Sequence, residues 1–392
     1  MSLFFIEAPV TITCNKFMVP SLEQEMQELG FTDYEVFTTG VRLYTTIDQC
    51  IQLNLGLRCG SQILFSLDQF EAVNGDEIYD HLLDIAWEDI IPEGEHFSVT
   101  SNVQNSTINN SMYANLRVKD AVVDRLRQLR GRRPETGSDL TGVVIHLYWK
   151  DDFAEIFIDT SGDSLARHGY RKIPGTAPML EALAASVIYS SRWDRRSVLI
   201  NPMCGSGTLA IEAALLASNT APGLFRDNYS FMHLQGYDAA RYAQERGRLE
   251  QQITEPLRLR IIASDHSEKA VANARKNARA AGVEELITFS VCDFEQTEVP
   301  ELAPGEKGVM IVNPEYGERL GDISALEATY ARIGDFMKKK LMGYYGYVFT
   351  GNRELAKKIG LKPNRRIPYF NSTIDCRLLE YELYSGTRNP AQ

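Results

Sequence analysis

Three residues after one apolar segment have types that could carry out chemistry. In IVNPEYGERL, residues 311 to 320, the side-chain amide of Asn313 and the carbonyl of Pro314 offer hydrogen-bond acceptors, and Tyr316 offers an aromatic face. An exocyclic amine on a nucleobase is a poor nucleophile, because its lone pair is delocalised into the ring. Two acceptors for the amino hydrogens and a ring stacked on the base would hold such an amine in line with an electrophilic methyl group.

The same three residues, Asn313, Pro314 and Tyr316, form our candidate catalytic set, and the chemistry explains their types. The surplus proton on the methylated nitrogen is acidic and can leave late, so the reaction needs an amide rather than a histidine at this place. A structural interpretation competes with this one, since Asn-Pro-x-x-Gly is also a common turn after a strand.

The chain after residue 164 alternates apolar strands with amphipathic helices, which predicts a doubly wound, mostly parallel sheet covered on both faces. A closing antiparallel hairpin is expected over residues 365 to 384. The predicted parallel strands are residues 198 to 203, 260 to 265, 287 to 293, 308 to 313 and 345 to 351. Ligands bind beyond the carboxyl ends of such strands, so the residues that follow each strand are candidates for a site.

A glycine turn and two acids follow the first three of these strands. Gly205, Gly207 and Ala210 satisfy GxGxxG/A, but the next acid at a strand end, Asp265, comes far later than the 20 or so residues of a dinucleotide site, which argues against NAD. Asp265 suits a ribose diol, and Asp293 with Phe294 beside it suits an adenine. Together these features predict an adenosyl ligand, although a glycine turn and helix-capping acids have ordinary structural interpretations.

The first 164 residues read as an α+β region with a basic helix. That helix is predicted from Asn110 to Arg130, with a buried stripe of Val118, Val122, Leu126 and Leu129. Residues 101 to 135 carry seven basic side chains against three acids, and residues 337 to 366 carry nine against one, on a chain of net charge −11. Such local surfaces suit a polyanion. The candidate RNA-binding residues are Arg117, Lys119, Arg127, Arg130, Arg132 and Arg133.

Composition limits the remaining function classes. The six cysteines form no CxxC or Cys/His cluster, so neither a disulfide framework nor a metal site is expected. The sequence shows no signal peptide and no apolar run long enough to cross a membrane, so we expect a cytoplasmic protein without a membrane partner. No obligate protein partner is indicated.

Several segments resemble a known enzyme family. NPMCGSGTLAIEAALLA, ASDHSEKAVANARKNARAAG and NPEYGERL, in that order, resemble the class I S-adenosylmethionine-dependent N-methyltransferases. NNSMYANLRVKDAVVDRL and DTSGDSLARHGYR are similar to the THUMP-containing methyltransferases that make N2-methylguanine in 23S rRNA, the family of the 23S rRNA (guanine-N2)-methyltransferase L. The resemblance runs over nearly the whole chain.

The resemblance implies a function, a cofactor and a domain order. It implies methyl transfer from S-adenosylmethionine, giving S-adenosylhomocysteine, to a guanine N2 amine in 23S rRNA or a large-subunit assembly intermediate. The implied domains are an N-terminal ferredoxin-like α+β subdomain (1–60), a THUMP RNA-binding domain (61–164) and a Rossmann-like methyltransferase domain with a seven-stranded sheet (165–392). The candidate cofactor-binding residues are Asn201, Met203, Cys204, Gly205, Ser206, Gly207, Thr208, Asp265, His266, Asp293, Phe294 and Asn313.

Two positions depart from the family pattern. Asn201 stands where the family usually has Asp, and Glu315 stands where it commonly has a second proline, so we expect Glu315 to face solvent. Three alternatives stay open. They are an adenine-N6 methyltransferase acting on DNA or RNA, an RNA-binding protein with an inactive methyltransferase fold, and, more distantly, an NAD oxidoreductase.

Overall fold

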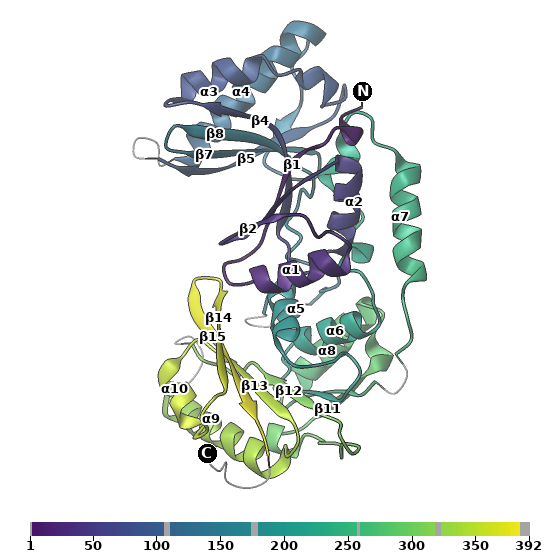
Figure 1. The fold of residues 1–392 in the computed structure, drawn as a ribbon, viewed down its shortest axis with the longest axis vertical. Helices are drawn as coiled ribbons and strands as arrows, with labels where there is room; N and C mark the ends of the chain where they lie inside the picture. Colours follow the sequence, from purple (N-terminus) through teal and green to yellow (C-terminus); the bar gives the residue numbers. More distant parts are fainter. Residues whose placement is uncertain (1, 106–109, 174–178, 257–258, 318–322, 385–392) are drawn as a thin grey trace. The chain divides into compact units, whose positions relative to one another are not determined.

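A computed structural model describes residues 2–105, 110–173, 179–256, 259–317 and 323–384, and the chain in it divides into two compact units (Figure 1). Unit 1 comprises Met1–Asn15, Leu22–Leu165 and Arg226–Gln251, and unit 2 comprises Lys16–Ser21, Ala166–Phe225 and Gln252–Gln392. Each unit is built around one β-sheet. Within the described residues, no helix combines the length and apolar character that crossing a membrane requires.

The sheet of unit 1 has eight strands in the order β2-β3-β1-β4-β8-β7-β5-β6. Its pairs are antiparallel except for β5 with β7 and with β6, which are parallel. The strands are β1 (Ala8–Thr13), β2 (Glu35–Phe37), β3 (Gly40–Thr45), β4 (Gln62–Glu71), β5 (Phe97–Gln104), β6 (Thr136–Gly137), β7 (Val143–Lys150) and β8 (Phe153–Asp159). Strands β2 and β3 form one antiparallel hairpin, and β7 and β8 form another.

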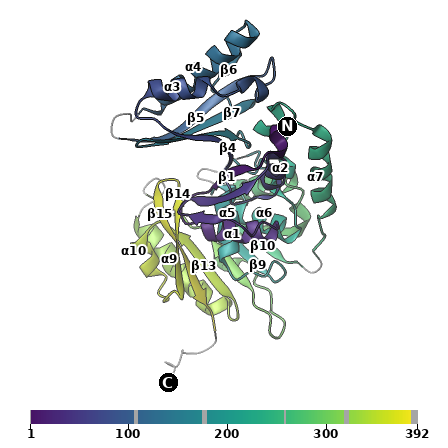
Figure 2. The same cartoon turned by 45° about the horizontal axis from the view of Figure 1, so that its top comes forward.

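Helices α3 and α4 lie together on one face of this sheet (Figure 2). The helices associated with unit 1 are α1 (Val19–Glu28), whose first residues belong to unit 2, α2 (Ile47–Gly56), α3 (Gly75–Leu83), α4 (Ser111–Arg130) and α7 (Ala239–Gln251). Helix α7 comes from a segment far along the chain, and Arg241 ties it to α2 through an ion pair with Asp48.

The predicted buried stripe of α4 is right for three residues and wrong for the fourth. Val118, Val122 and Leu126 are fully buried, whereas Leu129 is 55% exposed. The guanidinium of Arg130 explains the difference, because it donates to the carbonyls of Ile91 (2.6 Å) and Glu88 (3.2 Å). Arg130, four residues after Leu126, therefore occupies the inward face of the last turn, and Leu129 points outward.

The sheet of unit 2 has seven strands in the order β11-β10-β9-β12-β13-β15-β14. The first five are parallel, and β15 pairs antiparallel with both β13 and β14, as predicted for the closing hairpin. The strands are β9 (Leu199–Pro202), β10 (Ile261–Asp265), β11 (Ile287–Val291), β12 (Val309–Val312), β13 (Tyr345–Thr350), β14 (Arg365–Asn371) and β15 (Ile374–Glu382).

Helices cover both faces of this second sheet, which confirms the doubly wound prediction (Figure 1). One face is covered by α5 (Glu181–Ser190), α6 (Thr208–Ala217) and α8 (Glu268–Ala280), and the other by α9 (Ile323–Lys340) and α10 (Arg353–Lys358). The α9 side holds a core in which Ile200, Met310, Tyr330 and Phe336 are buried together. Since strands and helices are fixed by this packing, the carboxyl ends of the parallel strands form one stable edge.

Candidate active site

The strand order of this sheet reverses direction between β9 and β12. The two strands pair only through Leu199 with Val309 and Ile200 with Met310. Beyond these pairs, Asn201 Nδ2 donates to the Ile311 carbonyl at 2.9 Å. Asn201 thus bridges the two strands at the topological switch point, which is where open α/β sheets bind ligands.

The glycine turn after β9 is held by hydrogen bonds from neighbouring strands. The Cys204 amide donates to the Ser264 carbonyl at 2.9 Å, and the Gly207 amide donates to the Cys204 carbonyl at 2.9 Å. Met203, Gly205 and Gly207 all have positive φ, of 56°, 56° and 85°. Gly207 then caps α6, so this turn presents backbone amides at the start of a helix.

Asp265 closes the turn from the end of β10. Its Oδ2 accepts from the Gly205 amide at 3.0 Å, and its Oδ1 accepts from the Ser267 amide at 2.9 Å. The side chain of Ser267, rather than that of Asp265, caps α8, so the capping role expected of this acid is wrong. The Asp265 carboxylate instead fixes the glycine turn and the residue that caps the helix. The neighbouring His266 side chain is 78% exposed, with its Nδ1 3.5 Å from Asp265 Oδ1.

Asp293 lies one strand further out and is paired with an arginine that the sequence analysis did not single out. Arg332 donates to Asp293 Oδ1 at 2.7 Å, and this hydrogen bond lowers the pKa of the Asp293 carboxyl. The Arg332 guanidinium also lies 4.8 Å from the centroid of the Phe294 ring. Phe294 is 6% exposed and packs edge-on against Phe336, so its side chain serves the core.

The tip of β12 places an unpaired acceptor at the switch point. Asn313 Oδ1 is buried and has no hydrogen-bond partner among the described residues, and the same holds for Oδ1 of Asn201. A buried acceptor without a donor costs about 1–3 kcal/mol, which a ligand donor would recover. Pro314 is buried, whereas Glu315 is exposed, so the prediction that Glu315 faces solvent is confirmed.

The ring of Tyr316 is fixed from two directions. Its hydroxyl accepts a hydrogen bond from Asn371 Nδ2 at 2.8 Å, and its ring meets the Phe349 ring edge-on, with centroids 6.2 Å apart. Burial raises the pKa of the Tyr316 hydroxyl well above its usual range. The neutral, tethered ring is therefore a rigid surface rather than a proton donor or base at neutral pH.

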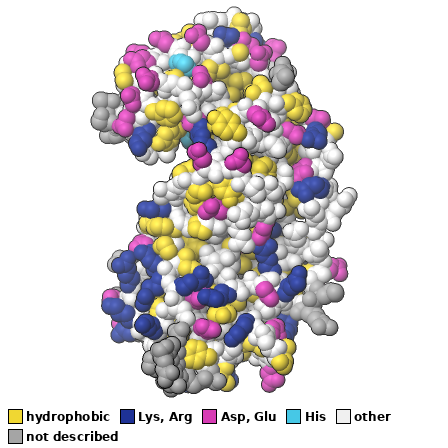
Figure 3. Space-filling model, viewed as in Figure 1, with side chains coloured by type: hydrophobic (Ala, Val, Ile, Leu, Met, Phe, Trp, Pro, Cys, Tyr) yellow, Lys and Arg dark blue, Asp and Glu magenta, His cyan; other side chains and the backbone are white. Residues whose placement is uncertain are grey.

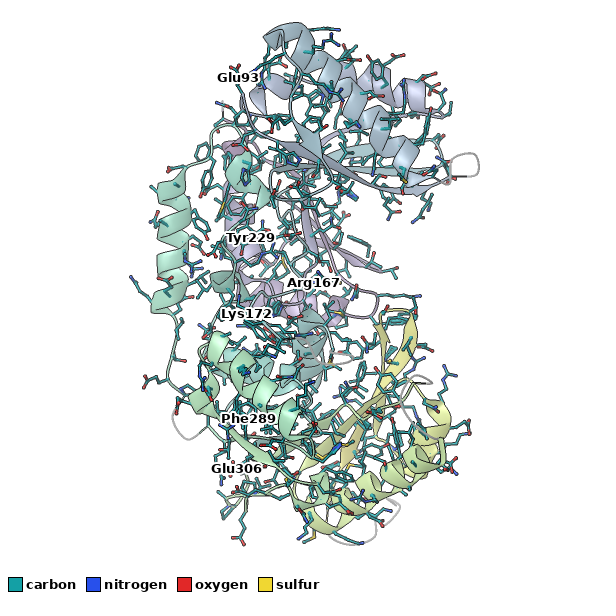
Figure 4. All side chains as sticks on the ribbon, turned by 180° about the vertical axis from the view of Figure 1, so that it is seen from behind. Glu93, Arg167, Lys172, Tyr229, Phe289 and Glu306 are labelled. Atoms are coloured by element: carbon teal, nitrogen blue, oxygen red, sulfur yellow. The ribbon has the colours of Figure 1, made fainter. Side chains whose placement is uncertain are left out.

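Two further residues hold the turn, and neither was predicted. Asn277 of α8 donates to the Ser206 carbonyl at 3.2 Å and accepts from the amide of Lys172, labelled in Figure 4, at 3.2 Å. Arg171 donates to Thr208 Oγ1 at 3.1 Å. The signal for Asn277 was available, since a polar residue stands on the face of α8 that buries Val271 and Ala274.

The six candidate RNA-binding residues fall into three groups. Arg117 and Arg130 fold back onto unit 1, Arg117 through an ion pair with Asp76 at 2.8 Å and Arg130 through the carbonyls described above. Arg132 is exposed and pairs with Glu93, labelled in Figure 4, at 2.7 Å. Lys119, Arg127 and Arg133 make no ion pair among the described residues, and Arg127 and Arg133 are exposed.

Within the part of the chain that the structure describes, no group of three His, Cys, Asp or Glu side chains is arranged to hold a metal ion. Cys204, in the glycine turn, is partly buried, and burial raises the pKa of its thiol. The site thus offers hydrogen-bond acceptors, backbone amides and one aromatic surface.

The strand order of unit 2, with its antiparallel strand between β13 and β14 and its glycine turn after β9, defines a methyltransferase-type α/β fold. A family model described as an RMKL-like methyltransferase domain matches residues 168–380, and a THUMP-domain model matches residues 72–159. The chain therefore belongs to the RMKL-like methyltransferase-domain family and carries a THUMP domain.

Curated relatives and solved structures agree with this assignment. Ribosomal RNA large subunit methyltransferase K/L of Syntrophotalea carbinolica is 33% identical over 96% of this chain and 54% of that protein, and its counterpart in Psychromonas ingrahamii is 35% identical over 94% and 49%. The chain thus spans about half the length of these relatives.

Two crystal structures resemble nearly the whole chain. SMU.472 complexed with SAH has a TM-score of 0.86 and 27% identity, covering 97% of this chain and 99% of that chain. A predicted N6-adenine-specific DNA methylase from Listeria monocytogenes str. 4b F2365 has a TM-score of 0.85 and 27% identity, covering 96% and 97%. Both likenesses extend over the two units described above.

The two glycines of the turn should respond differently to alanine. A Cβ at Gly205 would meet no atom of the described residues within 4 Å, whereas a Cβ at Gly207 would lie 2.9 Å from Ala274 Cβ. Both substitutions carry the left-handed backbone cost of about 1–2 kcal/mol, and Gly207→Ala adds the cost of overpacking α6 against α8. Urea unfolding should show Gly207→Ala as the less stable variant by about 1 kcal/mol or more. Equal stabilities would contradict the packing described here.

Proposed function

We propose that this chain transfers a methyl group from S-adenosylmethionine to the exocyclic N2 amine of a guanine in 23S rRNA. The observation that carries the proposal is the tip of β12, where the Asn313 Oδ1 acceptor is buried without a partner among the described residues. Three residues later in the chain, Tyr316 is held in place by Asn371. These are the groups needed to fix an amine and the base that bears it.

The residues at the strand ends fit an adenosyl cofactor. A Cβ at Gly205 would point into open space with respect to the described residues, and the buried Asn201 Oδ1 offers an acceptor without a partner among them. We assign the turn from Met203 to Thr208 to the methionine part, and Asp265, with His266 after it, to the ribose. Arg332 and the Glu295 amide (3.0 Å) both donate to Asp293 Oδ1, so Oδ2 is assigned to the adenine amino group, next to the Phe294 backbone.

The bound cofactor would supply an electrophilic sulfonium methyl group. Asn313 Oδ1 and the Pro314 carbonyl would accept hydrogen bonds from the two amino hydrogens and direct the nitrogen lone pair toward that methyl. As the new N–C bond forms, the S–C bond to the methyl would break and leave S-adenosylhomocysteine, and the surplus proton on the methylated nitrogen would pass to solvent. Tyr316 stacks on the base and prevents its rotation. Since the ring is already fixed by Asn371 and Phe349, little ordering is needed when the base arrives, which lowers the entropic part of the barrier.

An RNA substrate is supported by the front of the chain and by the relatives. The THUMP match covers residues 72–159, and the named relatives act on ribosomal RNA of the large subunit. We retain the proposed division into an N-terminal subdomain (1–60), an RNA-binding THUMP domain (61–164) and a methyltransferase domain (165–392), with Arg226–Gln251 folding back into unit 1.

The second candidate function is adenine-N6 methylation. It is favoured by the name of the Listeria monocytogenes structure, and the acceptors at Asn313 and Pro314 would serve an adenine amine equally well. Incubating the protein with labelled S-adenosylmethionine and 23S rRNA, followed by mass spectrometry of the nucleosides, separates the two. N2-methylguanosine supports the first function and N6-methyladenosine the second, and the absence of both products contradicts methylation of either base in 23S rRNA.

Cofactor binding should depend on Asp265. Asp265→Ala removes the acceptor for the ribose diol and also releases the Gly205 amide, so calorimetry should show S-adenosylmethionine affinity reduced at least about tenfold. Ser267→Ala is the matched control, because it removes the side-chain cap of α8 and leaves the carboxylate in place. Wild-type affinity in Asp265→Ala would remove this residue from the site.

Catalysis should depend on Asn313 and not on Glu315. Asn313→Ala should lower kcat by about 10² or more with near wild-type cofactor affinity, because its acceptor acts most strongly in the transition state. Asn313→Asp keeps an oxygen acceptor, so its kcat should fall by less than that of Asn313→Ala. Glu315→Gln should leave rate and pH profile unchanged, since Glu315 is exposed. Wild-type turnover by Asn313→Ala would overturn the mechanism, and a shifted pH profile in Glu315→Gln would give that carboxylate a chemical role.

RNA binding should depend on the exposed cations of the basic helix and its end. The affinity K for RNA falls as salt rises. In the double variant Arg127→Gln, Arg133→Gln, the plot of log K against log salt should be less steep, by about 0.7 to 0.9 for each phosphate that is no longer neutralised. Arg130→Gln should instead destabilise unit 1, because it removes donors to buried carbonyls. An unchanged salt slope in the double variant would show that these cations are a solvated surface only.

A further inference from the structure

Two phenylalanines from distant parts of the chain form a stacked pair in unit 2. The rings of Phe17 and Phe370 have centroids 5.7 Å apart and planes inclined by 11°. Lys16 Nζ lies 5.2 Å from the Phe17 centroid and 5.9 Å from the Phe370 centroid. Both rings are partly exposed, and Lys16 is exposed. An aromatic surface with a cation beside it is therefore open to solvent.

The backbone of Phe17 is in an unusual conformation. Its φ is 74°, in the left-handed region that a bulky side chain rarely adopts. The following residues, Met18 and Val19, are buried, so the chain is anchored immediately after the strained position. Strain of this kind persists where the surrounding structure holds it, and it is common at sites that bind ligands.

The stacked pair is linked to the catalytic tip through the β14-β15 hairpin. Asn371, next to Phe370, donates the hydrogen bond to the Tyr316 hydroxyl. A Cβ at Gly351 would lie 2.6 Å from Ile374 Cγ2 and 2.9 Å from Tyr316 Cδ2, so the hairpin end and the Tyr316 ring both pack against that glycine. The hairpin turn that begins at Asn371 holds the Tyr316 ring, and it directly follows Phe370 of the aromatic surface.

The charges around the hairpin end are mainly positive. Arg353 and Arg377 share one acid, Asp375, through contacts that involve its two oxygens, and Lys16 adds a further cation. Figure 3 shows dark blue side chains over the part of unit 2 that contains α10 and this hairpin, with hydrophobic side chains among them. Aromatic rings with surrounding cations suit a single-stranded nucleic acid, whose bases stack and whose phosphates need neutralisation.

We propose that Phe17, Phe370 and Lys16 form a binding subsite for an RNA nucleotide that flanks the methylated base. This inference rests on the proposed function, because it assigns a place to the substrate next to Tyr316. A base that leaves its helix to stack on Tyr316 deprives its neighbour of a stacking partner, and an aromatic surface beside the site replaces that partner. The Lys16 ammonium lies where it can meet the adjoining phosphate.

The test uses the full chain and a short single-stranded RNA that contains guanine. Phe370→Leu keeps an apolar side chain but removes the stacking face, so the Kd for this RNA should rise about tenfold while the Kd for S-adenosylhomocysteine is unchanged. Phe370→Trp should retain RNA affinity, and RNA should quench the fluorescence added by that tryptophan. Lys16→Gln should weaken RNA binding and reduce its salt dependence.

Tyr384→Leu is the matched control, because Tyr384 is an exposed aromatic of the same unit. Urea unfolding checks that each variant is folded. If Phe370→Leu does not fold, the test uses Phe370→Trp and Lys16→Gln instead. Wild-type RNA affinity in folded Phe370→Leu, or unquenched fluorescence in Phe370→Trp with RNA bound, would overturn the subsite. Methylation by the wild type alongside such results would leave the proposed function standing, whereas quenching without any methylation would support the subsite and contradict that function.

Discussion

The site depends on the point where β9 and β12 stop pairing. Two residue pairs join the strands, and beyond them the Asn201 amide donates to the Ile311 carbonyl. The Oδ1 of the same Asn201 amide is a buried acceptor without a partner among the described residues. Asn313, two residues after Ile311, presents a second one. The end of the β9-β12 pairing therefore coincides with two buried acceptors that lack a donor among the described residues.

The glycine turn is rigid because it is held from outside. Its own residues are small, and their conformations are maintained by Asp265 at Gly205, Asn277 at Ser206 and Arg171 at Thr208. Each contact comes from a different part of unit 2, so the turn keeps its shape without a ligand. Preorganisation of this kind reduces the entropy lost on binding.

The order of residues along the chain and their order in space differ at two places. Between β9 and β10 the chain leaves unit 2, and Arg226–Gln251 folds with unit 1, so the acid at Asp265 comes late in sequence although its strand is next to β9. The β14-β15 hairpin returns from the far end of the chain to hold Tyr316 through Asn371. A spacing rule made for an uninterrupted βαβ unit therefore does not apply here.

The sequence alone determined the strands, the helices and the residues that follow the strands, because apolar periodicity and turn chemistry are local properties. The chemistry of its amide predicted a role for Asn313, and the departure of Glu315 from the family pattern predicted its exposure. Only the tertiary structure decided which partners those residues have. Asn371 stands 55 residues from Tyr316, and Arg130 reaches carbonyls about 40 residues away instead of facing solvent with the other basic residues. Such contacts depend on which elements pack together, and no pattern within a single helix or strand records that choice.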